Sequence, residues 1–333
     1  METAVLGRSG VPVTRIGFGA APLGGLFRPV TEAEAEGAVT AAWEAGIRYF
    51  DTAPHYGAGL SEQRLGAVLR GCPRDAFTVS TKVGRLLGAE GDGGAPEFTG
   101  APDRVRIRDY SRDGVLRSLE SSLGRLGLDR VDVVYVHDPD EHWEQAADEA
   151  FPALAQLRAE GVVRAIGAAM NQSAMLARFV AETDLDVVLC AGRCSLLDGS
   201  AQRELFPLCR REGVAAVAAG VFNSGVLAGP RPGAAYDYAA APPAVVARAR
   251  RIATVCRGYG VPLAAAALAW AARDAAVASV LVGMRSATEV AEDVRLAGLT
   301  VPAELWAELD GSGLLPRRGE LREQPATPRS RRD

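Results

Sequence analysis

Residues 111–137, SRDGVLRSLESSLGRLGLDRVDVVYVH, contain the pattern that decides the fold of this chain. Apolar residues recur every three or four positions over Ser111–Leu126, which predicts a helix with one apolar face. Val131–His137 is a short apolar run rich in valine, which predicts a buried strand. A helix followed by a fully buried strand is typical of a parallel sheet that helices cover.

The same alternation extends in both directions along the chain. Strands are predicted at Arg15–Ala20, Arg48–Ala53, Thr78–Val83, Val131–His137, Val163–Ala168, Asp186–Ala191, Val214–Ala219 and Ser279–Gly283. Helices are predicted at Thr31–Ala45, Ser61–Leu69, Ser111–Leu126, Glu144–Glu160, Ser173–Glu182, Ser200–Arg211, Ala244–Tyr259, Pro262–Arg273 and Thr288–Ala297. Eight strand–helix units with no composition break favour an α/β fold of the closed (β/α)8 TIM-barrel type. Two Rossmann halves are disfavoured because no G-x-G-x-x-G follows an early strand.

This pattern predicts a single barrel domain over residues 1–315. A hairpin formed by Ala4–Leu6 and Val11–Val13 precedes the barrel and is expected to close its bottom. Two connections exceed the usual length, Gly84–Tyr110 and Gly220–Pro243, and should overhang the active face. Residues 316–333 carry six arginines and three prolines with few apolar residues, so we expect a disordered tail.

Composition excludes several classes of protein. With 37 Lys+Arg, 41 Asp+Glu and 48% apolar residues, the chain is neither disordered nor basic, and we expect no nucleic-acid partner. The longest apolar run, Val261–Ala272, falls short of the ~18 residues of a spanning helix, and no secretory signal opens the chain. The five cysteines are scattered, so we expect reduced thiols, no metal and a cytoplasmic location.

Chemically useful side chains stand at the ends of three successive predicted strands. Asp51 ends the second strand, with Tyr56 just beyond it, Lys82 lies in the third, and His137 ends the fourth. Lys82 is the only lysine among the 37 basic residues. Three of these residues also have a purely structural explanation: Asp51 can cap a turn, Tyr56 can be an aromatic residue at the rim, and His137 can be a core histidine. In a barrel, however, the carboxyl ends of the strands face the reaction site, so the four side chains are expected to converge.

Several motifs in the same order resemble the aldo-keto reductase family. They are Gly17-Phe18-Gly19, Asp51-Thr52-Ala53 through Tyr56-Gly57, Thr81-Lys82-Val83, Ser122-Leu123-Gly124-Arg125-Leu126 with Asp129 and Asp132, Tyr135-Val136-His137, and Ala165-Ile166-Gly167 running to Asn171. Together they cover nearly the whole barrel. The resemblance implies that Asp51, Tyr56, Lys82 and His137 form a catalytic tetrad, and that a nicotinamide cofactor binds over the barrel mouth.

The tetrad's roles follow from acid–base chemistry. A free phenol has a pKa near ~10, and a neighbouring ammonium lowers it. We therefore expect Lys82, held by Asp51, to lower the pKa of Tyr56. Tyr56 would exchange a proton with the substrate oxygen, and His137 would orient that oxygen through a hydrogen bond.

The resemblance also assigns residues to the cofactor and the substrate. The cofactor set is Gly19, Ala20, Asp51, Asn171, Gly220, Phe222, Asn223, Ser224, Gly225, Gly283, Met284, Arg285, Ser286, Glu289, Glu292 and Asp293. The substrate set is His55, Tyr56, His137 and Arg193. Two members keep structural alternatives, since Ser286 can cap a helix and Arg193 can be an ion-pair partner.

Departures from the family pattern bear on the cofactor. NADP-dependent relatives often carry a basic residue where this chain has Gly283 and Glu289. An acid near the ribose repels a 2′-phosphate, so NAD is favoured over NADP, although Arg285 keeps NADP open. The usual glutamine and stacking aromatic of the sixth and seventh strands are replaced by Ala191 and Ala219. Phe222 is a candidate for the missing aromatic.

The substrate is inferred from further likeness within the family. Residues 166–172, 191–197 and 221–225 resemble the branch of sugar 1-dehydrogenases that includes L-fucose, D-threo-aldose and pyridoxal 4-dehydrogenases. This implies oxidation of an aldose C1 hemiacetal to a lactone. The alternatives are a general NADPH-dependent aldehyde or ketone reductase, pyridoxal 4-dehydrogenase activity, and a cofactor-binding regulatory subunit. We expect a small sugar or carbonyl substrate, no membrane partner, and a monomer or small homo-oligomer.

Overall fold

Eight parallel strands close into a barrel in a computed structural model that describes residues 1–89, 95, 97–102 and 104–316. Around the barrel the strands follow one another in chain order, and the last one, β14, pairs with the first, β3. They are β3 (Ile16–Gly19), β4 (Tyr49–Asp51), β5 (Thr78–Val83), β8 (Val133–His137), β9 (Ala165–Met170), β10 (Val187–Ala191), β11 (Ala215–Ala219) and β14 (Val277–Gly283). The predicted (β/α)8 barrel is therefore confirmed.

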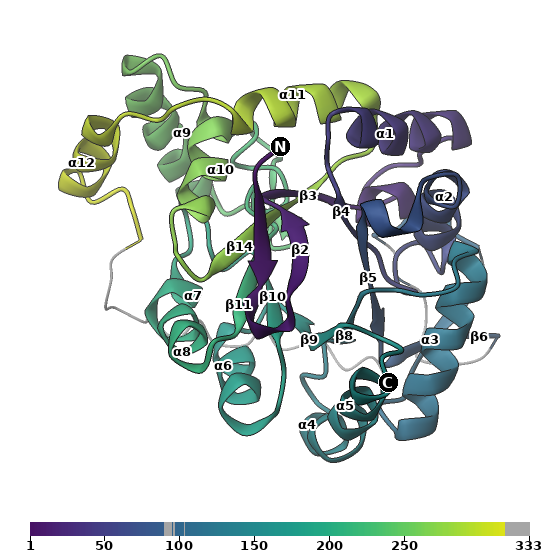
Figure 1. Ribbon diagram of the computed structural model, residues 1–333. Coiled ribbons are helices and arrows are strands. Elements are labelled where there is room, and N and C mark those ends of the chain that lie inside the picture. Colours follow the sequence, from purple (N-terminus) through teal and green to yellow (C-terminus); the bar gives the residue numbers. More distant parts are fainter. Residues whose placement is uncertain (90–94, 96, 103, 317–333) are drawn as a thin grey trace, which may run out of the picture.

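Helices form a ring around the barrel (Figure 1). They are α1 (Glu32–Glu44), α2 (Leu60–Leu69), α3 (Arg112–Leu126), α4 (Trp143–Gln145), α5 (Phe151–Ala159), α6 (Ser173–Glu182), α7 (Ser200–Arg203), α8 (Leu205–Glu212), α9 (Pro243–Gly258), α10 (Leu263–Ala272), α11 (Ala287–Ala297) and α12 (Ala303–Gly311). Helix α1 begins where the sequence indicates, because Thr31 and Glu34 form a capping box.

The predicted hairpin closes one end of the barrel. Strands β1 (Thr3–Leu6) and β2 (Val11–Thr14) pair antiparallel and lie across the front of the barrel in Figure 1. Leu6, Val11 and Val13 are at most 1% exposed and pack against residues that point into the barrel. These apolar contacts exclude water from the amino ends of the strands, so the opposite mouth is the open one.

The structure departs from the sequence predictions at several places. Pro152 has no N–H to donate, and the predicted helix over 144–160 widens into a π turn at Ala146–Ala150. The predicted helix over 200–211 breaks between α7 and α8 at Glu204. The predicted loop 84–110 contains a hairpin of β6 (Arg85–Gly88) and β7 (Val105–Arg108). Helix α12 was not predicted. Residues 317–333, predicted to be disordered, lie outside the described residues.

The loop over 220–243 also carries a short hairpin. Strands β12 (Ala235–Tyr236) and β13 (Ala239–Ala240) pair antiparallel, and the two residues between them, Asp237 and Tyr238, both have positive φ. A two-residue turn with two positive φ values matches the right-handed twist of a hairpin. This hairpin stands at the open mouth, next to the loop that follows β11.

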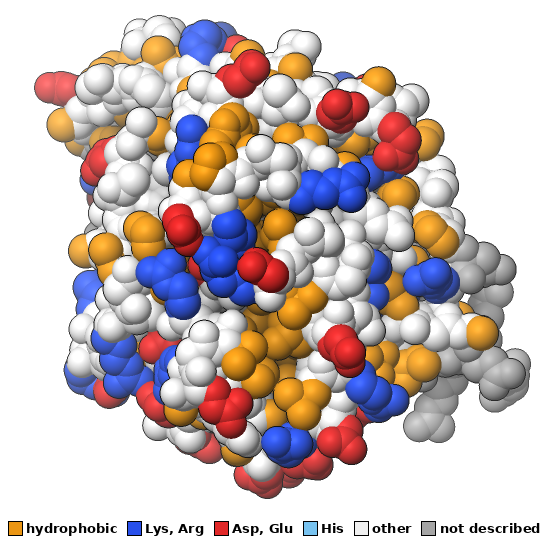
Figure 2. Space-filling model, turned by 45° about the vertical axis from the view of Figure 1, so that its right-hand side comes forward, with side chains coloured by type: hydrophobic (Ala, Val, Ile, Leu, Met, Phe, Trp, Pro, Cys, Tyr) orange, Lys and Arg blue, Asp and Glu red, His pale blue; other side chains and the backbone are white. Residues whose placement is uncertain are grey.

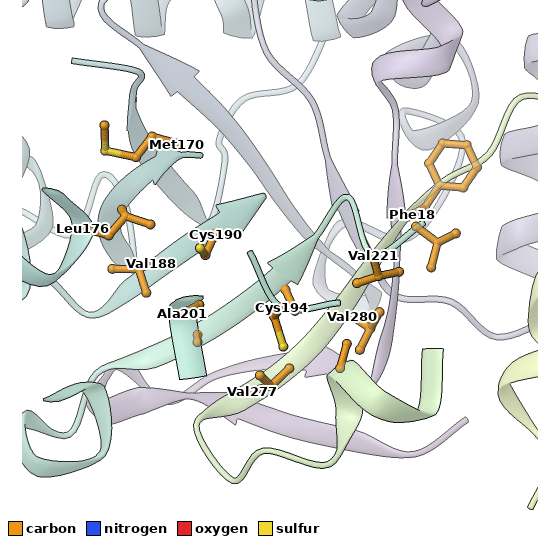
Figure 3. Packing of buried hydrophobic residues seen from close by; sticks show 14 of the residues in the cluster. Phe18, Met170, Leu176, Val188, Cys190, Cys194, Ala201, Val221, Val277 and Val280 are labelled. Carbon is orange, nitrogen blue, oxygen red and sulfur yellow. The ribbon is translucent and has the colours of Figure 1, made fainter. Parts of the chain in front are cut away.

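The main hydrophobic core lies between the barrel and the helices. Figure 3 shows Cys190 and Cys194 within it, among side chains such as Val188 and Val277. Burial raises the pKa of Cys190 to about 12, so this thiol stays protonated and apolar in character. Within the described residues, no group of three or more His, Cys, Asp or Glu side chains could hold a metal ion.

On the surface, charges of both signs are interspersed. Figure 2 shows arginine and acidic side chains side by side around an apolar strip on the face it presents. No single helix in the described ranges is long and apolar enough to cross a membrane. Only α9 and α10 together pass that test of length and composition, and they are bent by 95°.

Candidate active site

Adjacent strand ends bring the predicted tetrad together. Strands β4, β5 and β8 are consecutive in the barrel, and Asp51 and His137 are the last residues of β4 and β8. Lys82 lies near the end of β5, paired in register with Tyr135 of β8. Tyr56 follows β4 in a turn whose N–H groups bond back to the chain at Ala53 and His55. The tetrad is thus placed by barrel closure and one tight turn.

Asp51 and Lys82 form a fully buried ion pair. Lys82 Nζ donates to Asp51 Oδ2 at 2.6 Å and to the carbonyl oxygen of Thr52 at 3.0 Å. Ser80 Oγ donates to the other carboxylate oxygen of Asp51 at 2.6 Å. Both charged side chains are only 1% exposed. Because each charge keeps a second hydrogen bond, the pair offsets its own desolvation and fixes the lysine in one position.

Tyr56 packs between Lys82, His137 and Phe98. Lys82 Nζ lies 4.7 Å from the centre of the Tyr56 ring. The His137 ring meets the Tyr56 ring edge-on, with 5.8 Å between centroids. Phe98, from the segment between β6 and β7, stacks on the tyrosine with centroids 6.0 Å apart. The phenol is therefore held by rings on two sides and by the ammonium on a third.

The expected lowering of the Tyr56 pKa by Lys82 is wrong. Burial, and then the negative charges of Asp51 and Asp138, raise the pKa of Tyr56 well above its usual value, and only Arg85 opposes them. Because Asp51 neutralises Lys82 at 2.6 Å, the ammonium presents little net positive charge to the phenol. Tyr56 is thus a neutral proton donor.

His137 is a neutral imidazole aimed at the mouth of the barrel. Burial, and then the positive charges of Arg85 and Lys82, lower its pKa well below the usual range. Its Nδ1 atom is buried without a hydrogen-bond partner, and Nε2 lies 3.7 Å from Asp138 Oδ2. A neutral imidazole carries one N–H, which can orient a substrate oxygen as the sequence predicts.

A cavity of about 340 Å³ lies between the loops that follow β10, β11 and β14. Ten of the predicted cofactor residues line it: Asn171, Gly220, Phe222, Asn223, Ser224, Gly225, Gly283, Arg285, Glu289 and Asp293. Other members of that set are not among the residues that line the cavity, and they contact the rest of the protein. Ala20 and Met284 are completely buried, Ser286 caps α11 by accepting from the N–H of Glu289, and exposed Glu292 pairs with Arg295. Gly19 pairs in register with Gly283 and Asp51.

The loop over 220–225 has backbone geometry typical of a ligand-binding segment. Asn223, Ser224 and Gly225 have consecutive positive φ values of 45°, 58° and 104°. Strained backbone of this kind concentrates where ligands bind. The Oδ1 atom of Asn223 is buried without a partner, while its Nδ2 donates to the carbonyl oxygen of Gly192 at 3.0 Å. A Cβ added at Gly225 would meet nothing within 4 Å, so the loop leaves open space beside its backbone.

The other end of the cavity is acidic. Glu289 Oε2 accepts from the N–H of Arg285 at 3.0 Å, and Glu289 Oε1 lies 3.2 Å from the Arg285 guanidinium. The positive charge of Arg285 is therefore already paired. Burial, and then the charges of Glu289 and Glu292, raise the pKa of Asp293 to about 7. A further anion at this end would meet an existing excess of carboxylates.

Ala191 and Ala219, which replace two larger family residues, lie side by side. They pair in register at the ends of β10 and β11, and Ala191 lines the cavity. Two aromatic side chains that sequence reasoning missed line the same cavity: Phe27 and Tyr238, whose ring centroids are 6.2 Å apart. They are 211 positions apart in the chain, so nothing in the sequence indicates that they meet.

Two predicted substrate residues have protein partners. Arg193 donates to both carboxylate oxygens of Asp237, at 3.0 and 2.9 Å, and so anchors the β12–β13 hairpin. His55 lies beside the tetrad, with its ring centroid 5.8 Å from that of His137. Its Nε2 is 3.4 Å from Glu97 Oε1, and burial lowers its pKa to about 4. Arg193 thus has the structural role left open by the sequence, whereas His55 stands at the reaction site.

Comparisons with known proteins agree with this geometry. The model of the Aldo/keto reductase family matches residues 15–313. The chain is 45% identical to a D-threo-aldose 1-dehydrogenase from a Pseudomonas species over 92% of this chain and 96% of that one. It is 42% identical to a pyridoxal 4-dehydrogenase from Microbacterium luteolum, over 94% of this chain and 98% of that one. The solved structure of an aldo-keto reductase from Bacillus halodurans, in its holo form, superposes with a TM-score of 0.76. The two sequences are 25% identical, and the superposition covers 97% of this chain and 99% of that one.

Proposed function

Because this chain belongs to the Aldo/keto reductase family, we propose that it oxidises the C1 hemiacetal of an aldose to a lactone. The chain is an oxidoreductase, and the family uses a nicotinamide dinucleotide. The observation that carries the proposal is the convergence of Tyr56, His137 and the Asp51–Lys82 pair at the carboxyl end of the barrel, the end at which the loop over 220–225 lines a cavity. The likeness to a D-threo-aldose 1-dehydrogenase supports the aldose.

Each tetrad residue has a role in this reaction. His137, as a neutral imidazole, donates its N–H to the substrate oxygen and orients C1. Tyr56 exchanges the proton of that oxygen, accepting it during oxidation and donating it during reduction. The Asp51–Lys82 ion pair keeps the floor of the site rigid. A bound nicotinamide dinucleotide would supply the hydride acceptor for C1, so that removal of the hydroxyl proton by Tyr56 would leave a C1 carbonyl.

The raised pKa of Tyr56 sets the direction of the pH dependence. A phenol can accept a proton only after it has lost its own, and burial with the charges of Asp51 and Asp138 disfavours that loss. Oxidation should therefore accelerate as pH rises above neutrality. Reduction uses the neutral phenol and should not require alkaline conditions.

For the cofactor, we propose that Asn171, the loop over 220–225 and the segment 283–293 hold the dinucleotide. NAD is preferred over NADP because Glu289 and Asp293 make the far end of the cavity acidic, and Arg285 is already paired with Glu289. Phe27 and Tyr238 supply aromatic surface where Ala191 and Ala219 are small.

The test is the absorbance of reduced nicotinamide during incubation with NAD+ or NADP+ and a panel of substrates. We expect signal growth with NAD+ and L-fucose or D-arabinose. Growth with pyridoxal alone would support pyridoxal oxidation, the second candidate, which the 42% identical relative favours. Signal loss with simple aldehydes and NADPH alone would show a general reductase. Cofactor binding without turnover of any substrate would refute an enzymatic role.

Two further expectations accompany this proposal. We place the enzyme in the cytoplasm as a monomer or small homo-oligomer, with a small sugar as substrate and no nucleic-acid or membrane partner. Light scattering of the purified protein measures its mass in solution and tests the oligomeric state.

A further inference from the structure

Unpartnered buried polar atoms gather around the reaction site. In the part of the chain that the structure describes, several buried side-chain nitrogen and oxygen atoms have no hydrogen-bond partner. Among them, His55 Nδ1 and His137 Nδ1 belong to the two imidazole rings beside Tyr56. Arg106 Nε and Arg85 Nε belong to side chains that bond the carbonyl oxygen of His55 and the carboxylate of Asp138. Buried polar groups are nearly always hydrogen-bonded, so a cluster of exceptions marks a place where polar ligand atoms can bind.

Within this cluster, Arg85 and Asp138 form an ion pair next to the catalytic imidazole. Arg85 Nη2 donates to Asp138 Oδ2 at 2.5 Å, and the two side chains are 14% and 25% exposed. The same carboxylate oxygen lies 3.7 Å from His137 Nε2. That distance is too long for a direct hydrogen bond, so the carboxylate and the imidazole stand side by side and do not bond each other.

The surrounding backbone holds this pair in place before any ligand binds. The hydroxyl of Tyr110 lies 2.7 Å from the carbonyl oxygen of His137 and 2.8 Å from that of Asp138. It therefore donates a hydrogen bond to the backbone at the end of β8. Its ring fills the space beside Gly84, where an added Cβ would lie 2.2 Å from a ring atom. Tyr110 therefore joins the start of the β6–β7 hairpin, which carries Arg85, to the strand end that carries Asp138.

We infer that the Arg85–Asp138 pair binds the C2 hydroxyl of the sugar, the hydroxyl next to the reacting carbon; this rests on the proposed aldose oxidation. When the C1 oxygen accepts from His137, the oxygens of C1 and C2 are vicinal and lie a hydrogen-bond length apart. The C2 hydroxyl then reaches Asp138 Oδ2, to which it donates, and Arg85 holds that carboxylate in place through the hydrogen bond from its Nη2. The pair thereby selects 2-hydroxy substrates over substrates that lack this group.

The test compares substrates that differ only at C2. D-Arabinose and 2-deoxy-D-ribose are one such pair, and L-fucose and 2-deoxy-L-fucose are another. For the wild-type enzyme we expect kcat/KM to be about 10- to 100-fold higher for the 2-hydroxy sugar, as for loss of a hydrogen bond to a charged group. Asp138→Asn and Arg85→Met should each lower this ratio towards one. Asparagine suits the position because Asp138 has a φ of 42°, which asparagine tolerates.

A matched control comes from the closed end of the barrel. Arg158 and Asp184 form an ion pair with the same separation of 2.5 Å, and Asp184→Asn should leave the substrate ratio unchanged. A wild-type ratio near one, or two variants that keep the wild-type ratio, would overturn the inference while leaving aldose oxidation intact. Failure of the wild-type enzyme to oxidise any aldose would instead refute the proposed function, and this inference with it.

Discussion

Replacement of Lys82 by methionine tests the buried ion pair at the base of the site. Methionine keeps much of the apolar stem and removes the ammonium, which leaves the Asp51 carboxylate 1% exposed with Ser80 as its remaining partner. Loss of one partner of a buried pair costs about 3–5 kcal/mol in the free energy of unfolding, because the other charge stays desolvated.

This cost converts into a measurable shift of the melting temperature. With an unfolding entropy of about 2.1 cal/mol/K per residue, some 300 ordered residues give about 0.65 kcal/mol/K, so we expect a decrease of about 5–8 °C. Thermal melts followed by far-ultraviolet circular dichroism at neutral pH measure it. The double variant Asp51→Asn/Lys82→Met removes both charges and should recover much of the loss.

Turnover separates the structural from the catalytic part of this reasoning. Both the single and the double variant should lack aldose oxidation, because each lacks the Asp51–Lys82 pair that holds the floor of the site against the Tyr56 ring. A single variant that melts within about 1 °C of the wild type would show that the pair contributes nothing to stability. A double variant no more stable than the single one would show that the isolated Asp51 charge is not the cause.

Three other predictions use independent features of the molecule. Tyr56→Phe should lower kcat by about 10²–10⁴-fold, the range for loss of a general acid or base, while the Kd for NADH measured by fluorescence titration changes little. The pKa of Asp293 is raised to about 7, so its carboxyl loses its proton as pH rises through neutrality. The ratio of the Kd for NADP+ to that for NAD+ should then increase with pH, and should increase less in Asp293→Asn; equal slopes in both proteins would contradict this. Gly84→Ala should destabilise the protein and raise KM for the aldose, because its Cβ would lie 2.2 Å from the Tyr110 ring at a φ of +98°. Gly213→Ala, with a similar φ of +69° and nothing within 4 Å, controls for backbone strain alone, and equal effects of the two changes would rule out the contact with Tyr110.

The sequence by itself determined the barrel and the identity of the tetrad. Local patterns suffice for the barrel, because buried parallel strands read as apolar runs and the helices between them as periodic ones, whereas the tetrad was assigned from the family resemblance. Errors arose where a single residue changes helix geometry, as at Pro152, and where a strand boundary moved, as from Val163–Ala168 to Ala165–Met170. The tetrad could be predicted because its residues lie in or just beyond successive strand ends and match the motifs of the aldo-keto reductase family.

Only the tertiary structure decided the electrostatics and the shape of the site. The pKa of Tyr56 depends on burial and on Asp51 and Asp138, whose charges approach it only once the barrel closes. The Arg85–Asp138 pair joins residues 53 positions apart. These effects depend on distance and dielectric environment, which vary with the packing of the whole chain, whereas a sequence pattern reports only the neighbours within a helical turn or a strand.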